Sequence, residues 1–221
     1  PHKKDRDRFV LSKGHTAPAL YATLANAGYF PKEKLMTSFR YVDCMLQGHP
    51  DMKKTPGVEM TSGSLGIGLS AACGMALGLR HQGIASRVYC MIGDGEINEG
   101  EIWEAAATAS HYHLDNLVAF TDVNGLQNDA ETKKVKDMLD IAAKWKAFGW
   151  NTLEINGHDF EEIFAALDAA RECKGRPTAI ISHTVKGKGV SFMENVVAFH
   201  GKTPSKEEYE NGMKELEEVS L

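Results

Sequence analysis

The stretch RVYCMIGDGEINEGEIWEAAATASHYHLDNLVAFTDVNGLQ, residues 87–127, holds two apolar segments separated by a helical pattern. Residues 87–92 are apolar and rich in branched side chains, and they stop at a Gly-Asp-Gly turn, as buried strands often do. Residues 98–109 carry apolar side chains at helical spacing, with glutamates in the early turns. Residues 117–121 form a second apolar run. We therefore predict a right-handed strand, helix, strand crossover in which the strands are parallel.

Asp94 and Asn124 stand where these two strands end. Because open parallel sheets bind ligands at the carboxyl ends of their strands, the two side chains should lie side by side at a ligand site. Magnesium is usually held by one or two protein oxygen ligands together with phosphate oxygens and water. Gly95 would let the main chain approach a diphosphate. A Gly-Asp-Gly tripeptide alone is most often only a turn, but its place between two apolar strands predicts a magnesium and diphosphate site.

The remaining sequence alternates helical and strand patterns, which predicts an α/β fold, a doubly wound and mostly parallel sheet with helices on both faces. We expect a single domain over residues 1–221, an irregular segment at residues 41–61 and a small-residue loop that becomes a helix at residues 62–78. Further helices are expected at residues 16–28, 32–39, 135–148, 160–172 and from 205 onward, and strands at residues 151–155 and 178–183.

Composition narrows the class of protein. With 221 residues and 43% hydrophobic content, the chain can bury a sizeable core. The net charge of -5, with both signs interspersed, gives no basic footprint for nucleic acid or anionic lipid. No apolar stretch approaches the length of a membrane span and none resembles a signal peptide, so we expect a soluble cytoplasmic protein. The four cysteines have no paired spacing, which favours buried free thiols over zinc ligands or disulfides.

Several motifs together resemble a known family. The Gly-Asp-Gly turn followed by Asn124 is similar to the diphosphate and magnesium motif of thiamine diphosphate enzymes, and the other motifs narrow the resemblance to transketolase. These occur in the family's order and span nearly the whole chain: DRFVLSKGH (residues 7–15), QGHPD (47–51), PGVEMTSGSLGIG (56–68), KGKGVSFME (186–194) and FHGKTPS (199–205). The nearest likeness is to the amino-terminal subunit of two-subunit transketolases.

The resemblance implies a set of cofactor residues. The expected cofactors are thiamine diphosphate and Mg²⁺, with Asp94, Asn124 and the carbonyl of Leu126 as metal ligands. Cofactor contacts are implied for His15, Gly63, Ser64, Leu65, Asp94, Gly95, Asn124, His183 and His200. Among these, His15 would contact the diphosphate, and Leu65 would wedge the cofactor rings. His183 occupies a place where many relatives have a lysine.

Two histidines are implied as catalytic. His49 would meet the sugar hydroxyls near the reacting carbon, and His200 would lie between cofactor and substrate. An imidazole that titrates near neutrality can exchange protons with either partner of a reaction. Five further histidines are better explained as surface or satisfied core residues: His2, His81, His111, His113 and His158. Glu99 and Glu104 match family glutamates at a subunit interface, although two solvated helix glutamates would look the same.

The chain also departs from the family pattern. Phe199 replaces a tryptophan, Ile67 replaces a glutamine, and Val123 stands where an Asn or Asp is common. Relatives carry one or two further helices and another histidine motif before Asp7. In the family, the glutamate that activates the aminopyrimidine ring comes from a separate pyrimidine-binding domain. We therefore expect a carboxyl-terminal partner chain that completes the site.

The resemblance implies that the chain, with its partner, transfers a two-carbon ketol unit from a ketose phosphate to an aldose phosphate. Such an activity belongs to the pentose phosphate pathway, and a dimer or heterotetramer is the expected assembly. Two alternatives remain: a ketol transferase that acts on an unusual sugar, and a truncated, catalytically inactive cofactor-binding module. A thiamine enzyme for 2-oxo acids is disfavoured, because it would not be expected to combine SKGH, GHPD and FHGK.

Overall fold

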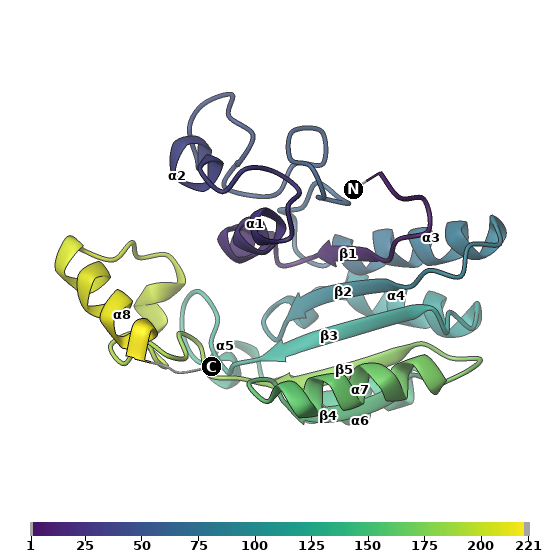
Figure 1. Ribbon diagram of the computed structural model, residues 1–221. Coiled ribbons are helices and arrows are strands. Elements are labelled where there is room, and N and C mark those ends of the chain that lie inside the picture. The colour runs from purple at the N-terminus through teal and green to yellow at the C-terminus, as the bar shows by residue number, and fades with distance from the viewer. Residues whose placement is uncertain (1, 219–221) are drawn as a thin grey trace.

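The computed structural model describes residues 2–218 and contains a five-stranded sheet of order β1-β2-β3-β5-β4 (Figure 1). Every pair of neighbouring strands is parallel. The expected doubly wound α/β fold is therefore confirmed. The strands are β1 (Arg8–Leu11), β2 (Val88–Gly93), β3 (Leu117–Val123), β4 (Asn151–Asn156) and β5 (Thr178–His183).

Helices cover both faces of the sheet, while α8 lies beyond the carboxyl ends of the strands (Figure 1). The α-helices are α1 (Ala17–Asn26), α2 (Lys34–Ser38), α3 (Ile67–His81), α4 (Gly100–His111), α5 (Thr132–Lys136), α6 (Ile141–Ala147), α7 (Phe160–Glu172) and α8 (Lys206–Glu218). The 3-10 turns are η1 (Gly14–Thr16), η2 (Glu96–Asn98) and η3 (Val197–His200).

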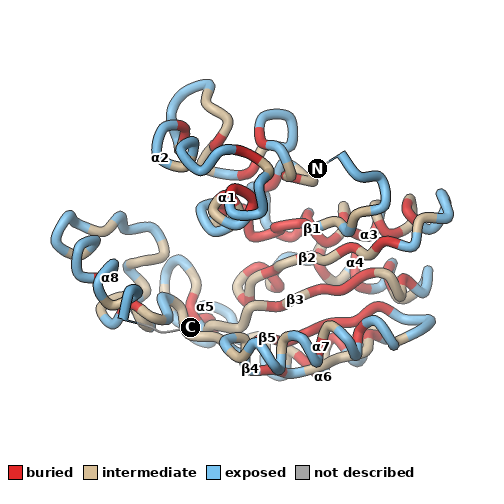
Figure 2. Tube along the Cα trace, viewed as in Figure 1, coloured by how far each residue is buried: buried red, intermediate tan, exposed pale blue. Residues whose placement is uncertain are grey.

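Alternation along the central strands separates two layers of core. In β2, Val88, Cys90 and Ile92 join the large cluster made with α3, α4 and α6, whereas Tyr89 joins the smaller cluster under α7. This is the pattern of a strand buried on both faces, since successive side chains point to opposite sides of a sheet. The buried residues accordingly concentrate along the sheet (Figure 2). The sheet is thus a rigid platform for the loops at its carboxyl edge.

A separate cluster supports the irregular segment at residues 41–61. It is built around Tyr21 of α1, with Leu46 and Val58 of the segment itself. Tyr21 also donates its hydroxyl hydrogen to the carbonyl of Gln47, at 2.8 Å. As expected from its glycine and proline content, the segment contains no helix or strand of its own. Packing rather than backbone pairing therefore fixes the loop that carries His49.

One strand was not predicted, and one prediction of a helix was wrong. The motif at residues 7–15 contains an edge strand, β1, which we did not expect from its four residues. The helix expected at residues 135–148 is split into α5 and α6, because Leu139 has a positive φ of 53° that no helix accommodates. Asp140 then caps α6 by accepting a hydrogen bond from the Ala143 amide at 2.7 Å.

The thiols are unpaired, as the spacing of the cysteines predicts. All four cysteines are free, and Cys73 and Cys90 are buried. Burial raises the pKa of the Cys73 thiol to about 12, so this side chain behaves as a small apolar residue. Within residues 2–218, no helix has the length and apolar character needed to cross a membrane.

The buried tryptophans give a test of the core. Trp145 and Trp150 pack with ring centroids 4.7 Å apart, but only Trp150 donates its indole N–H, to the carbonyl of Ala106 at 3.0 Å. The Trp145 indole nitrogen has no partner among the described residues. We expect Trp150→Phe to lower the free energy of unfolding by about 1 kcal/mol more than Trp145→Phe, since only the former breaks a hydrogen bond. Urea denaturation of both variants checks this, and equal losses would contradict it.

Candidate cofactor-binding and active site

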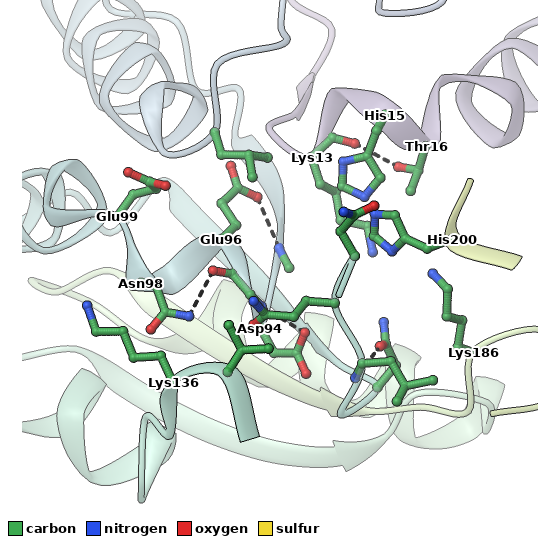
Figure 3. A pocket seen from close by; sticks show the side chains of 18 residues that line it. Lys13, His15, Thr16, Asp94, Glu96, Asn98, Glu99, Lys136, Lys186 and His200 are labelled. Atoms are coloured by element: carbon green, nitrogen blue, oxygen red, sulfur yellow. Dashed lines mark hydrogen bonds between the residues drawn. The ribbon is translucent and has the colours of Figure 1, made fainter. Parts of the chain in front are cut away.

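A pocket of about 310 Å³ opens at the carboxyl edge of the sheet (Figure 3). Loops that follow β1, β2, β3 and β5 line it, as expected for an open parallel sheet. Most of the sequence-predicted residues line this pocket: His15, Leu65, Asp94, Gly95, Asn124, Leu126 and His200. In the close view, Asp94 lies near the centre, with His15 and His200 together on one side and Glu99 and Lys136 on the other.

Asp94 is fixed in place by the turns around it. One carboxylate oxygen accepts from the Gly95 amide at 2.8 Å, and the other accepts from the Gly125 amide at 2.7 Å and from the Thr132 hydroxyl at 3.2 Å. A carboxylate offers about four acceptor positions, so capacity remains for a cation. Burial raises the pKa of Asp94 against these hydrogen bonds. A divalent cation would favour the ionised form that burial disfavours.

Asn124 lies beside Asp94 because β2 and β3 pair in parallel, with Gly93 opposite Asp122. Its side-chain oxygen accepts from the Leu126 amide at 3.0 Å, which orients this oxygen and turns the chain toward the Leu126 carbonyl. The described residues contain no cluster of three or more His, Cys, Asp or Glu side chains that could hold a metal. A magnesium ion here would therefore depend on one carboxylate, one amide, one carbonyl and the phosphate oxygens.

His15 and His200 stack with ring centroids 4.9 Å apart. Burial, the neighbouring His200 and the ammonium groups of Lys13 and Lys186 lower the pKa of His15 to about 4. Burial and the same two lysines also lower the pKa of His200. Both imidazoles are therefore neutral near neutral pH, and each can donate one N–H and accept one hydrogen bond.

The other predicted residues lie outside the lining of the pocket. The ring of His49 lies 3.8 Å from the position that a side chain at Gly63 would take, so His49 and the loop at residues 63–64 are neighbours. His183 hydrogen-bonds to Glu154 at 3.1 Å on the edge strand, and the structure does not bring it to the pocket. Lys186, three residues later, lines the pocket instead.

Three lysines that line the pocket were missed from the sequence, namely Lys13, Lys136 and Lys186. Lys13 and Lys186 line the pocket, and they bring positive charge to the place where a diphosphate is expected. Both lie in motifs that resemble the family, but we assigned no role to either lysine. A signal was available, because a lysine within a glycine-rich loop at a strand end is a common phosphate ligand.

Glu96 is a further missed residue, and it holds the loop that carries Leu65. Its carboxylate accepts from the Ser12 hydroxyl, from the Gly66 amide at 2.9 Å and from the Gly93 amide at 3.0 Å. Burial raises its pKa against these hydrogen bonds. One side chain therefore connects the loops after β1 and β2 with the beginning of α3.

Several polar atoms around the pocket lack a hydrogen-bond partner among the described residues. Buried atoms without a partner include the side-chain oxygens of Asn98 and Gln127 and the Nδ1 atom of His200. A side chain on Gly95 would approach Gln127 to 3.1 Å, so glycine keeps the floor of the pocket open. Buried polar atoms are normally hydrogen-bonded to protein, ligand or ordered water, so the two amide oxygens can accept from donors of a bound cofactor or from water beside it. Glu99 lines the pocket and is exposed, and Glu104 is exposed on α4.

Comparison with known proteins places this geometry in a family. The family described as transketolase, thiamine diphosphate binding domain, matches residues 1–216. This chain belongs to that family. The resemblance to transketolase drawn from the motifs is thus confirmed, and so is the thiamine diphosphate-binding character of the domain.

Relatives named as transketolase subunits match this chain over most of their own length. The 6-deoxy-6-sulfo-D-fructose transketolase subunit of Clostridium sp. strain MSTE9 is 46% identical over 217 residues, covering 98% of this chain and 78% of the relative. An apulose-4-phosphate transketolase subunit of Phocaeicola vulgatus is 41% identical over 218 residues, covering 99% and 77%. The expected likeness to one subunit of a two-subunit transketolase is therefore confirmed.

A solved transketolase shows the same fold. The crystal structure of transketolase from Campylobacter jejuni matches with a TM-score of 0.91 and 31% identity, covering 96% of this chain. The chain spans about a third of that transketolase, 34% of its length.

The lowered pKa of His15 can be measured in the transketolase domain. An NMR titration should give a midpoint near 4, and Lys186→Met should raise it, because that variant removes a positive charge that disfavours imidazolium. The pKa of His15 in the folded chain lies below its unfolded value of 6.5. The free energy of unfolding should therefore decrease, through His15, as pH falls from about 6.5 to about 4.

The matched control is Lys206→Met, which removes an exposed lysine charge on α8. Its His15 midpoint should equal that of the wild type, and the His15→Asn spectrum assigns the signal. A His15 midpoint near 6.5 would contradict the electrostatic description of the pocket.

Proposed function

We propose that this chain is the diphosphate-binding subunit of a transketolase that moves a two-carbon ketol unit from a ketose phosphate to an aldose phosphate. The observation that carries the proposal is the convergence of Asp94, Asn124, His15 and His200 on one pocket at the carboxyl edge of the sheet. Family membership supports a transferase of this kind. We further propose a single domain over residues 1–221, in a cytoplasmic enzyme of the pentose phosphate pathway.

Asp94, Asn124 and the Leu126 carbonyl would hold Mg²⁺, which would supply positive charge to neutralise the diphosphate. His15 can donate a hydrogen bond to a phosphate oxygen, and Lys186 can pair with its charge. Leu65, at 37% exposure on the pocket wall, offers an apolar surface to the cofactor rings, with Gly63 and Ser64 preceding it. When bound, thiamine diphosphate supplies the carbon nucleophile on which the transfer depends.

His49 and His200 would act on the sugar. A neutral His200 can accept a proton from a substrate hydroxyl and return it, and its unpartnered Nδ1 atom is available for this exchange. His49, beside Gly63, can bind and orient the hydroxyls near the reacting carbon. The family resemblance also implies His183 as a cofactor contact, but its bond to Glu154 favours Lys186 for that role.

The chain would need a partner to complete this site. Of the carboxylates in the described part of the pocket, Asp94 and Glu96 already accept hydrogen bonds from backbone amides of neighbouring loops, and Asp94 is the proposed metal ligand. We propose that the carboxylate which activates the cofactor comes from a pyrimidine-binding partner chain, and that two copies of each chain form a heterotetramer. Exposed Glu99, at the pocket wall, would then lie at the interface.

The sugar is proposed from the relatives alone. One relative is named for 6-deoxy-6-sulfo-D-fructose and another for apulose 4-phosphate. Both names describe a short ketose with an anionic group, so we propose a substrate of that class for this chain. An unusual sugar of the class, in place of the common pentose phosphates, is the second candidate that these names favour.

Cofactor binding tests the pocket directly. Calorimetric titration of the chain with thiamine diphosphate and Mg²⁺ should show saturable binding. We expect Asp94→Ala to weaken it by more than about 100-fold, since loss of even an outer-shell partner typically costs about 10- to 100-fold in metal affinity. The matched control is Asp168→Ala, because Asp168 is exposed on α7 and pairs only with Arg171 among the contacts described for it. Unchanged affinity in Asp94→Ala would remove the metal assignment.

The need for a partner gives a second test. Ketol transfer from fructose 6-phosphate, xylulose 5-phosphate or 6-deoxy-6-sulfofructose should be undetectable with the chain alone. It should appear on co-expression with a pyrimidine-binding chain encoded beside it, because only then is the activating carboxylate present. Normal turnover by the isolated chain would refute the half-site proposal. Cofactor binding without turnover in the reconstituted complex, on all three sugars, would favour the inactive module.

A further inference from the structure

Asp122 stands at the end of β3, two residues before Asn124, and its carboxylate is largely buried beneath the cofactor pocket. We propose that Asp122 is a positioning residue which holds three loops of the cofactor site in register. The inference rests on the proposed function, since it concerns how the same pocket is kept ready for thiamine diphosphate. Asp122 does not itself line the pocket.

Three segments that are far apart in the sequence meet on this one carboxylate. The Lys13 ammonium group donates to one carboxylate oxygen, and the Thr184 hydroxyl donates to the other. The side-chain amide of Asn124 also donates, at 3.4 Å. The three donors lie on the loops that follow β1, β3 and β5. These strands end at the same sheet edge because they are parallel, and the side chain of Asp122 joins the loops there.

Each donor lies close to a residue that reaches the pocket. Lys13 is two residues before His15, Thr184 is two residues before Lys186, and Asn124 is the proposed metal ligand itself. A displacement of any donor would therefore shift a cofactor contact. Catalytic and binding groups must be held within fractions of an ångström, which depends on the residues behind them.

Thr184 is held in place on two sides. Its backbone amide donates to the Val123 carbonyl at 3.1 Å, which continues the pairing of β3 and β5. Its methyl group lies so near Gly157 that a side chain on that glycine would approach it to 2.5 Å. The hydroxyl is thereby held toward Asp122. The next residues, Val185 and Lys186, then start from a fixed point.

The charge of Lys13 explains why residue 122 is acidic. Burial alone would raise the pKa of Asp122, but the charge of Lys13 and the hydrogen bonds from Lys13, Thr184 and Asn124 outweigh it, so that the pKa is lowered. The ionised carboxylate neutralises Lys13, whose side chain is only 11% exposed. Two lysines lie beside the stacked histidines, and Lys186 is then the one with a charge that is free to meet a diphosphate.

A simpler alternative is that the Lys13–Asp122 pair merely stabilises the fold. Removing either partner leaves the other buried and unpaired, which destabilises a protein for reasons unrelated to cofactor binding. Thr184 separates the two explanations, because Thr184→Val keeps the shape and both charges and deletes only the hydroxyl. Thr184→Ser restores the hydroxyl. A purely structural role predicts no dependence of cofactor affinity on that hydroxyl in a fully folded chain.

The experiment measures thiamine diphosphate and Mg²⁺ affinity by calorimetry, at a temperature well below the melting of each cofactor-free variant. We expect Thr184→Val to weaken binding by about 10-fold and Asp122→Asn by up to about 100-fold, in the range typical of outer-shell partners. Thr184→Ser should bind within about 3-fold of the wild type. The control Thr108→Val deletes an exposed hydroxyl that bonds within α4 and should leave affinity unchanged.

Wild-type affinity in Thr184→Val would overturn the inference. So would an equal loss in Thr184→Val and Thr184→Ser, because the hydroxyl would then not be the cause. If Asp122→Asn does not fold, the two Thr184 variants still decide the question. If the isolated wild type does not bind the cofactor, the same four measurements are made on its complex with the partner chain. Failure of the wild-type complex to bind would refute the proposed function, whereas binding by the wild-type complex with unchanged affinity in Thr184→Val would refute only the positioning role.

Discussion

Parallel pairing of β2 with β3 is the constraint on which the rest of the site depends. The register sets Gly93 opposite Asp122, and the next residues of both strands leave the sheet at the same edge. Asp94 and Asn124 become neighbours for that reason alone, although a helix and its flanking loops separate them in the sequence. The crossover through α4 buries its apolar face against the sheet, so that the hydrophobic core maintains the alignment of two polar side chains.

Buried carboxylates hold the loops of the site in position. Glu96 connects the turn after β1 to the beginning of α3, while Asp122 connects the loops after β1, β3 and β5. Inside a protein such hydrogen bonds are stronger than in water, and an unsatisfied partner is costly. The arrangement therefore tolerates few alternatives. Asp94 lines the pocket as Glu96 does, but it differs from both in keeping room for a cation beside Asn124.

The sequence was sufficient for the crossover and the fold class, and seven of the eleven predicted site residues line the pocket, since those depend on local patterns and on motifs. It did not reveal β1, because four residues carry little periodic signal. It did not reveal the break before α6, because nothing local marks Leu139 for a left-handed backbone. It also favoured His183 over Lys186. His183 ends β5 and Lys186 lies in the loop that follows. Which of the two side chains faces the cavity depends on contacts such as that of His183 with Glu154.

The stacked pair of His15 and His200 has a consequence for how the pocket meets an anion as acidity varies. With a pKa of about 4, His15 is only about 1% charged at pH 6, so it adds no titrating positive charge in the physiological range. The attraction for phosphate then comes chiefly from Lys186, although burial and the charge of Lys13 lower its pKa. Binding of the anionic ligand by charge therefore does not depend on protonation of the histidines. The neutral imidazoles remain able to accept or donate a single proton.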